Sequence, residues 1–296
     1  MEATPVTELR RTAGSGIDLL STAELVALMN EEDAVVPATV GAATADIADV
    51  VDAIVDRLRR GGRLVYAGAG TSGRLAELDA EECQATFATA PGQVVAVVAG
   101  TGAASVFDRE AAEDDEAAGR RALEQLAPRA DDAFVAVSAG GRTPYVVGAA
   151  AAAAARGAFT ACVVCVPDSS LATICEREIL VVVGPEVLAG STRLKAGTAQ
   201  KLVLNTISTV AMIRLGKTYA GLMVDVVAAN QKLRGRVQRI VAEATGALPD
   251  EVDAALAAAD GDTKVAIVGL LAGIGATDAR ARLDAAGGNV REALAG

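Results

Sequence analysis

Short apolar runs alternate with longer amphipathic stretches between residues 60 and 185 of this 296-residue chain. The runs are rich in valine and none alternates cleanly with polar residues, which is typical of strands buried on both faces of a parallel sheet. Five such strands with crossover helices predict a three-layer, doubly wound α/β core with a five-stranded parallel sheet. The predicted strands are 63–67, 93–99, 133–138, 159–166 and 179–183.

The flanking segments have helical patterns. Ser21 and Glu24 have capping-box spacing and predict the start of a helix that runs through Met29. A second helix is predicted over 44–60, ending at Gly61-Gly62. The seven alanines of 149–155 follow Pro144, which predicts a helix that packs closely on the sheet, although such low complexity also occurs in disordered segments. A long helix is predicted over 197–215.

The C-terminal part of the chain is divided by glycines and prolines into short helices. These are predicted at 250–260, 263–271 and 277–283, and the bundle is similar in pattern to a small ubiquitin-associated domain. We therefore expect a helical N-terminal segment over 1–45, an α/β domain over 46–235 and a small helical domain over 236–296.

Composition and charge exclude several classes of function. The formal net charge is −11, so the chain should repel nucleic acids and anionic membranes. The N-terminus is polar and no apolar run is long enough to span a bilayer, which predicts a cytoplasmic protein. The chain contains no histidine, so acid–base chemistry must use carboxylates, lysine, tyrosine, cysteine or water.

The four cysteines offer only a weak chemical signal. Cys162 and Cys165 have the spacing of a redox or metal motif, but both lie on a predicted strand, where residues three apart point to opposite faces. We interpret them as small buried hydrophobic residues. No metal or cofactor is predicted.

A glycine-rich loop follows the first predicted strand. Its sequence G-A-G-T-S-G, from Gly68 to Gly73, has the spacing of a dinucleotide fingerprint. However, the next strand is not followed by the acidic residue that would bind a ribose. The hydroxyls of Thr71 and Ser72, together with backbone N–H groups at a helix start, favour a site for a single phosphate. The alternative is a plain tight turn.

Two glutamates are candidate acid–base groups. Helical spacing puts Glu82 in line with Leu75 and Leu78, which we interpret as an inward face, whereas Glu81 should face water. A carboxylate on a buried face is a candidate for a raised pKa, although a solvated helix end explains it equally well. The acidic cluster 108–116 has the same ambiguity, since acids in the first turns of a helix usually lie in solvent.

The segment 184–201 follows the last predicted strand and is dense in hydroxyls and cations. At the carboxyl end of the sheet it could supply Ser191, Thr192 or Lys195 to an anion. The alternative is a structural loop that caps the following helix.

Together these motifs resemble one enzyme family, the N-acetylmuramic acid 6-phosphate etherases. The resemblance extends over nearly the whole chain and is most specific in G-S-T-R-L-K-A-G-T-A-Q-K, from Gly190 to Lys201. It is also carried by the glycine loop, by L-D-A-E-E-C ending at Cys83, by E-A-A-E-D starting at Glu110, by G-R-T-P-Y starting at Gly141, and by L-M-V-D ending at Asp225.

The resemblance implies a sugar isomerase (SIS) domain with flavodoxin-like topology, a homodimer with sites near the subunit interface, and a phosphorylated amino sugar as substrate. It implies that the D-lactyl ether is eliminated and water is added back, giving N-acetylglucosamine 6-phosphate and D-lactate without a cofactor. Glu82 and Glu113 correspond to the two glutamates that act in that family. We assign Glu82 as the acid for lactate and Glu113 as the base at C2, an assignment that leaves the reverse order open. The expected substrate- and phosphate-binding residues are Gly70, Thr71, Ser72, Gly73, Ser138, Gly140, Arg142, Thr143, Ser191, Thr192 and Lys195.

The sequence departs from the family pattern at several positions. Gly140 and Gly221 stand where a serine and an asparagine are usual, Glu81 replaces a small residue beside Glu82, Gln84-Ala85 replaces a proline pair, and Ala111 replaces a glycine. The change at Gly140 puts one hydroxyl contact in doubt. The alternatives to an etherase are a non-catalytic sugar-phosphate regulator of the same fold and an aldose–ketose isomerase.

Overall fold

The computed structural model describes residues 5–11, 16–226 and 231–296. By their internal contacts these fall into two compact units, residues 1–81 with 92–208 and residues 82–91 with 209–296. The division passes through two helices, α4 (Gly70–Phe87) and α9 (Lys195–Arg214), so each helix contributes to both units.

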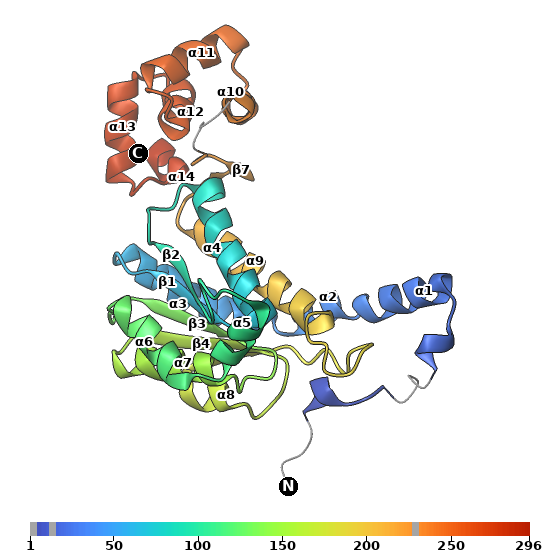
Figure 1. Cartoon of the computed structure of the whole chain (residues 1–296). Coiled ribbons are helices and arrows are strands. Elements are labelled where there is room, and N and C mark those ends of the chain that lie inside the picture. Colours follow the sequence, from blue (N-terminus) through green and yellow to red (C-terminus); the bar gives the residue numbers. More distant parts are fainter. Residues whose placement is uncertain (1–4, 12–15, 227–230) are drawn as a thin grey trace. The chain divides into compact units, whose positions relative to one another are not determined.

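The first unit contains the predicted five-stranded parallel sheet (Figure 1). The strand order β2-β1-β3-β4-β5 is the flavodoxin-like order, and every neighbouring pair is parallel. The prediction of a doubly wound sheet is therefore confirmed. The strands are β1 (Leu64–Gly68), β2 (Val94–Val98), β3 (Ala133–Val137), β4 (Phe159–Val164) and β5 (Arg177–Leu180).

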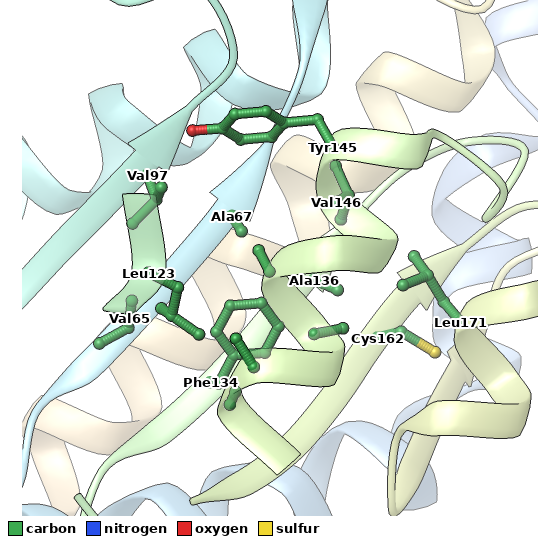
Figure 2. Close-up of a cluster of buried hydrophobic side chains, with 14 of the residues drawn as sticks. Val65, Ala67, Val97, Leu123, Phe134, Ala136, Tyr145, Val146, Cys162 and Leu171 are labelled. Atoms are coloured by element: carbon green, nitrogen blue, oxygen red, sulfur yellow. The ribbon is translucent and has the colours of Figure 1, made fainter. Parts of the chain in front are cut away.

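Helices cover both faces of this sheet. One face packs against α6 (Glu116–Gln125), α7 (Pro144–Ala155) and α8 (Ser170–Ile174) through the cluster shown in Figure 2. On the other face, the Tyr66 hydroxyl of β1 donates to Asp79 of α4 at 2.9 Å, and Ser208 of α9 donates to the same carboxylate at 3.0 Å. The remaining helices of this unit are α1 (Thr22–Asp33), α2 (Val36–Ala42), α3 (Thr44–Arg59) and α5 (Val106–Glu113).

The alanine run forms a helix that packs closely, as predicted. Most of α7 is buried, and Gly148 faces the backbone of Glu116, where a Cβ atom would overlap the carbonyl oxygen. In the same way, a Cβ atom on Gly119 of α6 would overlap the carbonyl oxygen of Tyr145. Small residues on both helices therefore permit an approach that larger side chains would prevent.

Other local predictions are also confirmed. The Ser21–Glu24 capping box is present at the start of α1, and α3 ends one residue before the expected position. All four cysteines are free thiols; burial raises the pKa of Cys165 to about 12, so this thiol stays protonated. The last strand differs from the prediction, because β5 begins two residues earlier, at the polar Arg177 and Glu178.

The second unit has its own core, formed mainly by α10–α14. The three predicted C-terminal helices are α11 (Pro249–Ala258), α12 (Thr263–Ala272) and α13 (Ala276–Ala285), and they are joined by α10 (Gln231–Thr245) and α14 (Val290–Ala295). A hairpin of β6 (Thr218–Tyr219) and β7 (Leu222–Met223) precedes them. Its turn has positive φ at Ala220 and at Gly221. Glycine tolerates this conformation because it has no Cβ atom, so Gly221 suits the turn.

Within the described residues, no single helix has the length and apolarity needed to cross a membrane. One bent pair of helices, Thr22–Ala42 with Thr44–Arg59, meets those two criteria together.

Candidate active site

The glycine loop joins the end of β1 to the start of α4. Gly68 and Gly73 face each other so closely that a Cβ atom on Gly68 would lie 2.7 Å from the nitrogen of Gly73. A Cβ atom on Gly73 would lie 2.6 Å from Cγ1 of Val98 on β2. Gly70 has a φ of 53°, in the left-handed region that favours glycine. The glycines thus let the helix start close to the sheet, with its leading N–H groups directed away from its own backbone.

A pocket of about 630 Å³ opens at this loop, and all of its lining residues belong to the first unit. It lies at the carboxyl ends of β1, β2 and β3, where the strand order of a doubly wound sheet reverses and where such proteins bind ligands. The sequence-predicted residues that line it are Gly70, Thr71, Ser72, Glu113, Ser138, Gly140, Thr143, Ser191 and Thr192.

Two hydroxyl groups stand at the start of α4. The Thr71 hydroxyl oxygen accepts a hydrogen bond from the Arg74 guanidinium at 3.0 Å. The Ser72 hydroxyl donates to Oε1 of the buried Gln200 at 2.9 Å. Because hydroxyls, backbone N–H groups and the helix dipole converge here, the loop is suited to a phosphate even in an acidic protein.

A second group of hydroxyls lies after β3. Ser138 is almost fully buried, and its hydroxyl oxygen accepts the N–H of Gly141 at 3.1 Å. The hydroxyls of Ser138 and Thr143 are 3.0 Å apart and share one hydrogen bond. This bonding fixes the 138–143 turn on the pocket wall. Gly140 between them has no atom within 4 Å of the place where a Cβ would be.

Glu113 is the last residue of α5 and lies against the glycine loop. A Cβ atom on Gly70 would lie 2.7 Å from Oε1 of Glu113. Burial raises the pKa of Glu113, the charges of Asp114 and Glu110 raise it further, and the charge of Arg74 opposes them. The acidic cluster is not one helix with acids in its first turn, because α5 ends at Glu113 and α6 starts after the N-cap Asp115. Glu113 is therefore at a helix end that faces the pocket.

Several charged residues on the pocket wall were not predicted from the sequence as site residues. They are Arg74, Glu77, Arg109, Glu110 and Arg193. Arg74 and Glu77 are exposed, and they line the pocket because α4 begins at its rim. The only available signal was the position of Arg74 directly after the glycine loop. The arginines give the pocket a local positive charge, although the chain as a whole is negatively charged.

Three of the predicted binding residues do not line the pocket. Gly73 packs against Val98, and Arg142, within the 138–143 turn, is partly buried. The Lys195 side chain is 4% exposed, and its ammonium group lies 2.5 Å from Oε2 of Glu32. Lys195 thus contacts α1, because it is the first residue of α9 and its side chain points away from the following turn.

The predicted inward face of α4 is wrong. Leu78 is 41% exposed and Glu82 is exposed, whereas Ala76, Asp79 and Ala80 are buried. The helix approaches the sheet through its small residues, continuing the close contact that Gly73 begins, so the leucines are displaced outward. Glu81 is exposed, as expected. Glu82 belongs by its contacts to the second unit, whereas the pocket belongs to the first.

Solved structures with this fold include a phosphoheptose isomerase from Francisella tularensis. It covers 66% of this chain and 100% of its own length, with a TM-score of 0.51 and 15% sequence identity. A phosphoheptose isomerase from Neisseria gonorrhoeae covers 64% of this chain and 98% of its own, with a TM-score of 0.50 and 16% identity. A family model of the glucokinase regulatory protein N-terminal SIS domain matches residues 46–154. The fold and the pocket therefore define an SIS-type α/β protein.

Comparison with curated relatives identifies the family within this fold class. The chain is 54% identical over 292 residues to an N-acetylmuramic acid 6-phosphate etherase of Streptomyces avermitilis, which covers 99% of this chain and 94% of the relative. It is 55% identical over 290 residues to the etherase of Rubrobacter xylanophilus, with 98% and 95% coverage. The chain belongs to the N-acetylmuramic acid 6-phosphate etherase family.

Proposed function

We propose that this chain cleaves the D-lactyl ether of N-acetylmuramic acid 6-phosphate and releases N-acetylglucosamine 6-phosphate and D-lactate, a step in amino sugar catabolism and cell-wall recycling. One observation supports it most strongly: a glycine loop suited to a phosphate, at the start of α4, lies beside the carboxylate of Glu113, in a chain about half identical to named etherases. The 6-phosphate occupies the Thr71 and Ser72 end of the pocket, and the sugar carbons extend toward Glu113.

The reaction needs two carboxyl groups in different protonation states. In the open-chain sugar the C1 aldehyde acidifies the C2 proton. A carboxylate removes that proton, the electrons form a C2–C3 double bond, and the C3–oxygen bond to lactate breaks as a carboxylic acid protonates the leaving oxygen. Water then adds its oxygen to C3 and a proton to C2. The product keeps the aldehyde and gains a C3 hydroxyl, so atoms balance without an oxidant.

We assign Glu113 as the base at C2 and Glu82 as the acid for lactate. The assignment of Glu113 as the base is supported by its position on the pocket wall and by its place against the glycine loop. Burial raises its pKa, which makes the ionised carboxylate a stronger proton acceptor than an exposed one. The assignment of Glu82 as the acid rests on its place in the L-D-A-E-E-C motif that resembles the family, and burial does not support it. Neither Glu82 nor Glu113 needs a cofactor for these steps.

We also propose a homodimer in the cytoplasm. Val106 lines the pocket and is 58% exposed, its neighbour Phe107 is 81% exposed, and a second copy would remove both from water. The proposed substrate carries a phosphate and a lactyl carboxylate, and a compound with these charges does not cross lipid bilayers. We therefore expect its enzyme in the compartment where the substrate is formed. The four free thiols agree with a reducing compartment.

The decisive measurement is D-lactate release from N-acetylmuramic acid 6-phosphate by purified protein, with chelator present throughout. We expect release by the native chain and a loss of about 10²–10⁴-fold in kcat in Glu82→Ala and in Glu113→Gln, the usual contribution of a general acid or base. Glu81→Ala is the matched control, because it removes an exposed neighbouring carboxylate. Tight binding of the phosphosugar without lactate release would instead identify a non-catalytic regulator, and interconversion of sugar phosphates without lactate would identify an isomerase.

A further inference from the structure

Gln200 of α9 is buried behind the phosphate loop and has an incomplete set of hydrogen bonds. Its side chain is 1% exposed and does not line the pocket. Oε1 accepts the hydroxyl of Ser72 at 2.9 Å. Nε2 is buried and has no hydrogen-bond partner among the described residues. Buried amide groups are almost always paired, because an unpaired N–H is destabilising. A methionine of similar volume would fill this space without that penalty, so the amide needs another explanation.

The position of Gln200 is fixed by close packing at the start of α9. One turn earlier on the helix, Gly197 faces the other loop hydroxyl residue, since a Cβ there would lie 3.5 Å from Cγ2 of Thr71. The fully buried Glu186 accepts the N–H groups of Lys195 and Ala196 at 3.0 and 2.9 Å, which fixes the first turn. Gln200 is thus held against Ser72 and cannot withdraw. Its terminal amide can still rotate, because that torsion has a broad, roughly two-fold profile.

The observed orientation is unfavourable for binding an anion. Ser72 lines the pocket, but its only hydroxyl hydrogen is directed at Gln200 and is not available to a ligand. If the amide rotates by half a turn, Nε2 takes the place of Oε1 and donates to the Ser72 oxygen. The hydroxyl hydrogen is then free to point into the pocket. The rotation also gives Nε2 a partner for one of its two N–H groups. Oε1 then takes the position without a partner, and a buried acceptor in that position is less unfavourable than a buried donor.

We propose that Gln200 is a positioning residue for the phosphate site: by rotation of its amide it turns the Ser72 hydroxyl hydrogen toward a bound phosphate. This inference rests on the proposed phosphate site at Thr71 and Ser72. It explains why an amide is used, since the residue must be able both to accept from Ser72 in the empty site and to donate to it in the occupied one. A carboxylate can only accept, and a thioether does neither effectively.

The test compares Gln200→Glu, Gln200→Met, Ser72→Ala and the double variant Ser72→Ala with Gln200→Met. For lactate release from N-acetylmuramic acid 6-phosphate, we expect KM to rise about tenfold in Gln200→Met and more in Gln200→Glu, while kcat changes less than about twofold. The inhibition constant of inorganic phosphate should rise in parallel. In the Ser72→Ala background the Gln200→Met change should have no further effect on either constant.

Asn205→Asp is the control, because it adds a negative charge on the exposed face of the same helix and should leave KM unchanged. The proposal is overturned if Gln200→Met leaves both KM and phosphate inhibition unchanged, or if its effect is the same with and without the Ser72 hydroxyl. A native chain that releases no lactate would refute the proposed function alone. The affinity of the same four variants for inorganic phosphate, measured by calorimetry, would then still decide the role of Gln200. The criteria are again whether Gln200→Met weakens phosphate binding and whether that effect requires the Ser72 hydroxyl.

Discussion

The carboxylate of Glu113 lies against Gly70 and occupies the space that a side chain there would need: a Cβ atom on Gly70 would lie 2.7 Å from Oε1 of Glu113. The two residues come from different helices, α5 and α4, and their contact joins the acidic cluster to the phosphate loop. If the loop holds the phosphate and Glu113 removes a proton, this contact sets the distance between the anchored end and the reacting carbon of the substrate. A change of about one ångström in such a distance can lower the rate about a hundredfold.

Gly70→Ala should therefore inactivate the enzyme through Glu113. The new methyl group would displace the carboxylate, and the positive φ would add a penalty of about 1–2 kcal/mol. Gly92→Ala is the matched control, since Gly92 also has positive φ but an added Cβ would meet no atom within 4 Å. Urea unfolding should show similar losses of stability in both variants, whereas kcat/KM should fall about a hundredfold only in Gly70→Ala. Equal activity in the two variants would show that the contact has no role in the reaction.

The pH dependence of the reaction should report the environment of Glu113. As the proposed base it must be ionised, so kcat/KM falls as the pH is lowered through its pKa, which burial has raised. Arg74 opposes this shift, so Arg74→Gln should raise the pKa further and move the acidic limb of the profile to higher pH. Arg74→Lys retains the charge and should move it less.

The control for this experiment is Arg121→Gln, which removes an exposed arginine of α6 that pairs with Asp115 at 3.5 Å. Titration of the substrate phosphate affects all variants equally, so the comparison between variants isolates the enzyme group. An acidic limb at the same pH in Arg74→Gln and in the native chain would exclude Glu113 as the group that titrates.

The main features of the fold could be predicted from the sequence because burial on both faces has a clear pattern. The valine-rich runs of β1 to β4 identify a parallel sheet, and the loop G-A-G-T-S-G marks where its ligand site opens. The edge strand β5 was displaced in the prediction, because an edge strand pairs on one side only and tolerates Arg177 and Glu178.

The contacts of α4 and α9 could not be predicted in the same way. Hydrophobicity placed Leu78 inward on α4, but close approach to the sheet selects the smallest side chains, such as Ala76. For α9, sequence spacing shows that Lys195 and Gln200 are near a loop of hydroxyls, but not which partner each one meets. Lys195 meets Glu32, which is 163 residues away, and only the tertiary structure brings the two together.

A substitution of Lys195 tests whether its ammonium group stabilises the fold or binds the substrate. Its ammonium pairs with Glu32 in a largely buried site, and Arg11 contacts the other oxygen of Glu32 at 2.8 Å. Lys195→Met should lower the free energy of unfolding by about 3 kcal/mol, the lower end for loss of one partner of a buried pair, because Arg11 remains beside Glu32. KM of the folded enzyme should change less than about twofold.

Arg60→Met is the matched control for Lys195→Met. Arg60 pairs with Asp131 at 2.7 Å, but both side chains are 51% exposed, so the loss should be at most about 1 kcal/mol. Chemical denaturation and Michaelis kinetics on the same preparations give both quantities. A tenfold rise in KM for Lys195→Met at unchanged stability would instead place the ammonium on the substrate, as the sequence predicted.

Gly140 tests whether the departure from the family sequence has altered the pocket. It lines the pocket, lies in the turn that Ser138 fixes, and has open space where a side chain would project. Gly140→Ser should introduce the hydroxyl that the family resemblance leads us to expect at this position and add one donor to the substrate, lowering KM by about three- to tenfold. The free energy of unfolding should change by less than about 0.5 kcal/mol, because nothing within 4 Å has to move.

The adjacent substitution Gly141→Ser has the opposite structural setting and serves as the control. Gly141 has a φ of 63°, and a Cβ atom there would overlap the side chain of Ser169. Left-handed strain and overpacking together should lower the free energy of unfolding by about 3 kcal/mol, without any gain in affinity. If Gly140→Ser leaves KM unchanged while the protein remains fully stable, the substrate does not reach the 138–143 turn. The phosphosugar would then be confined to the part of the pocket between the Thr71–Ser72 loop and Glu113.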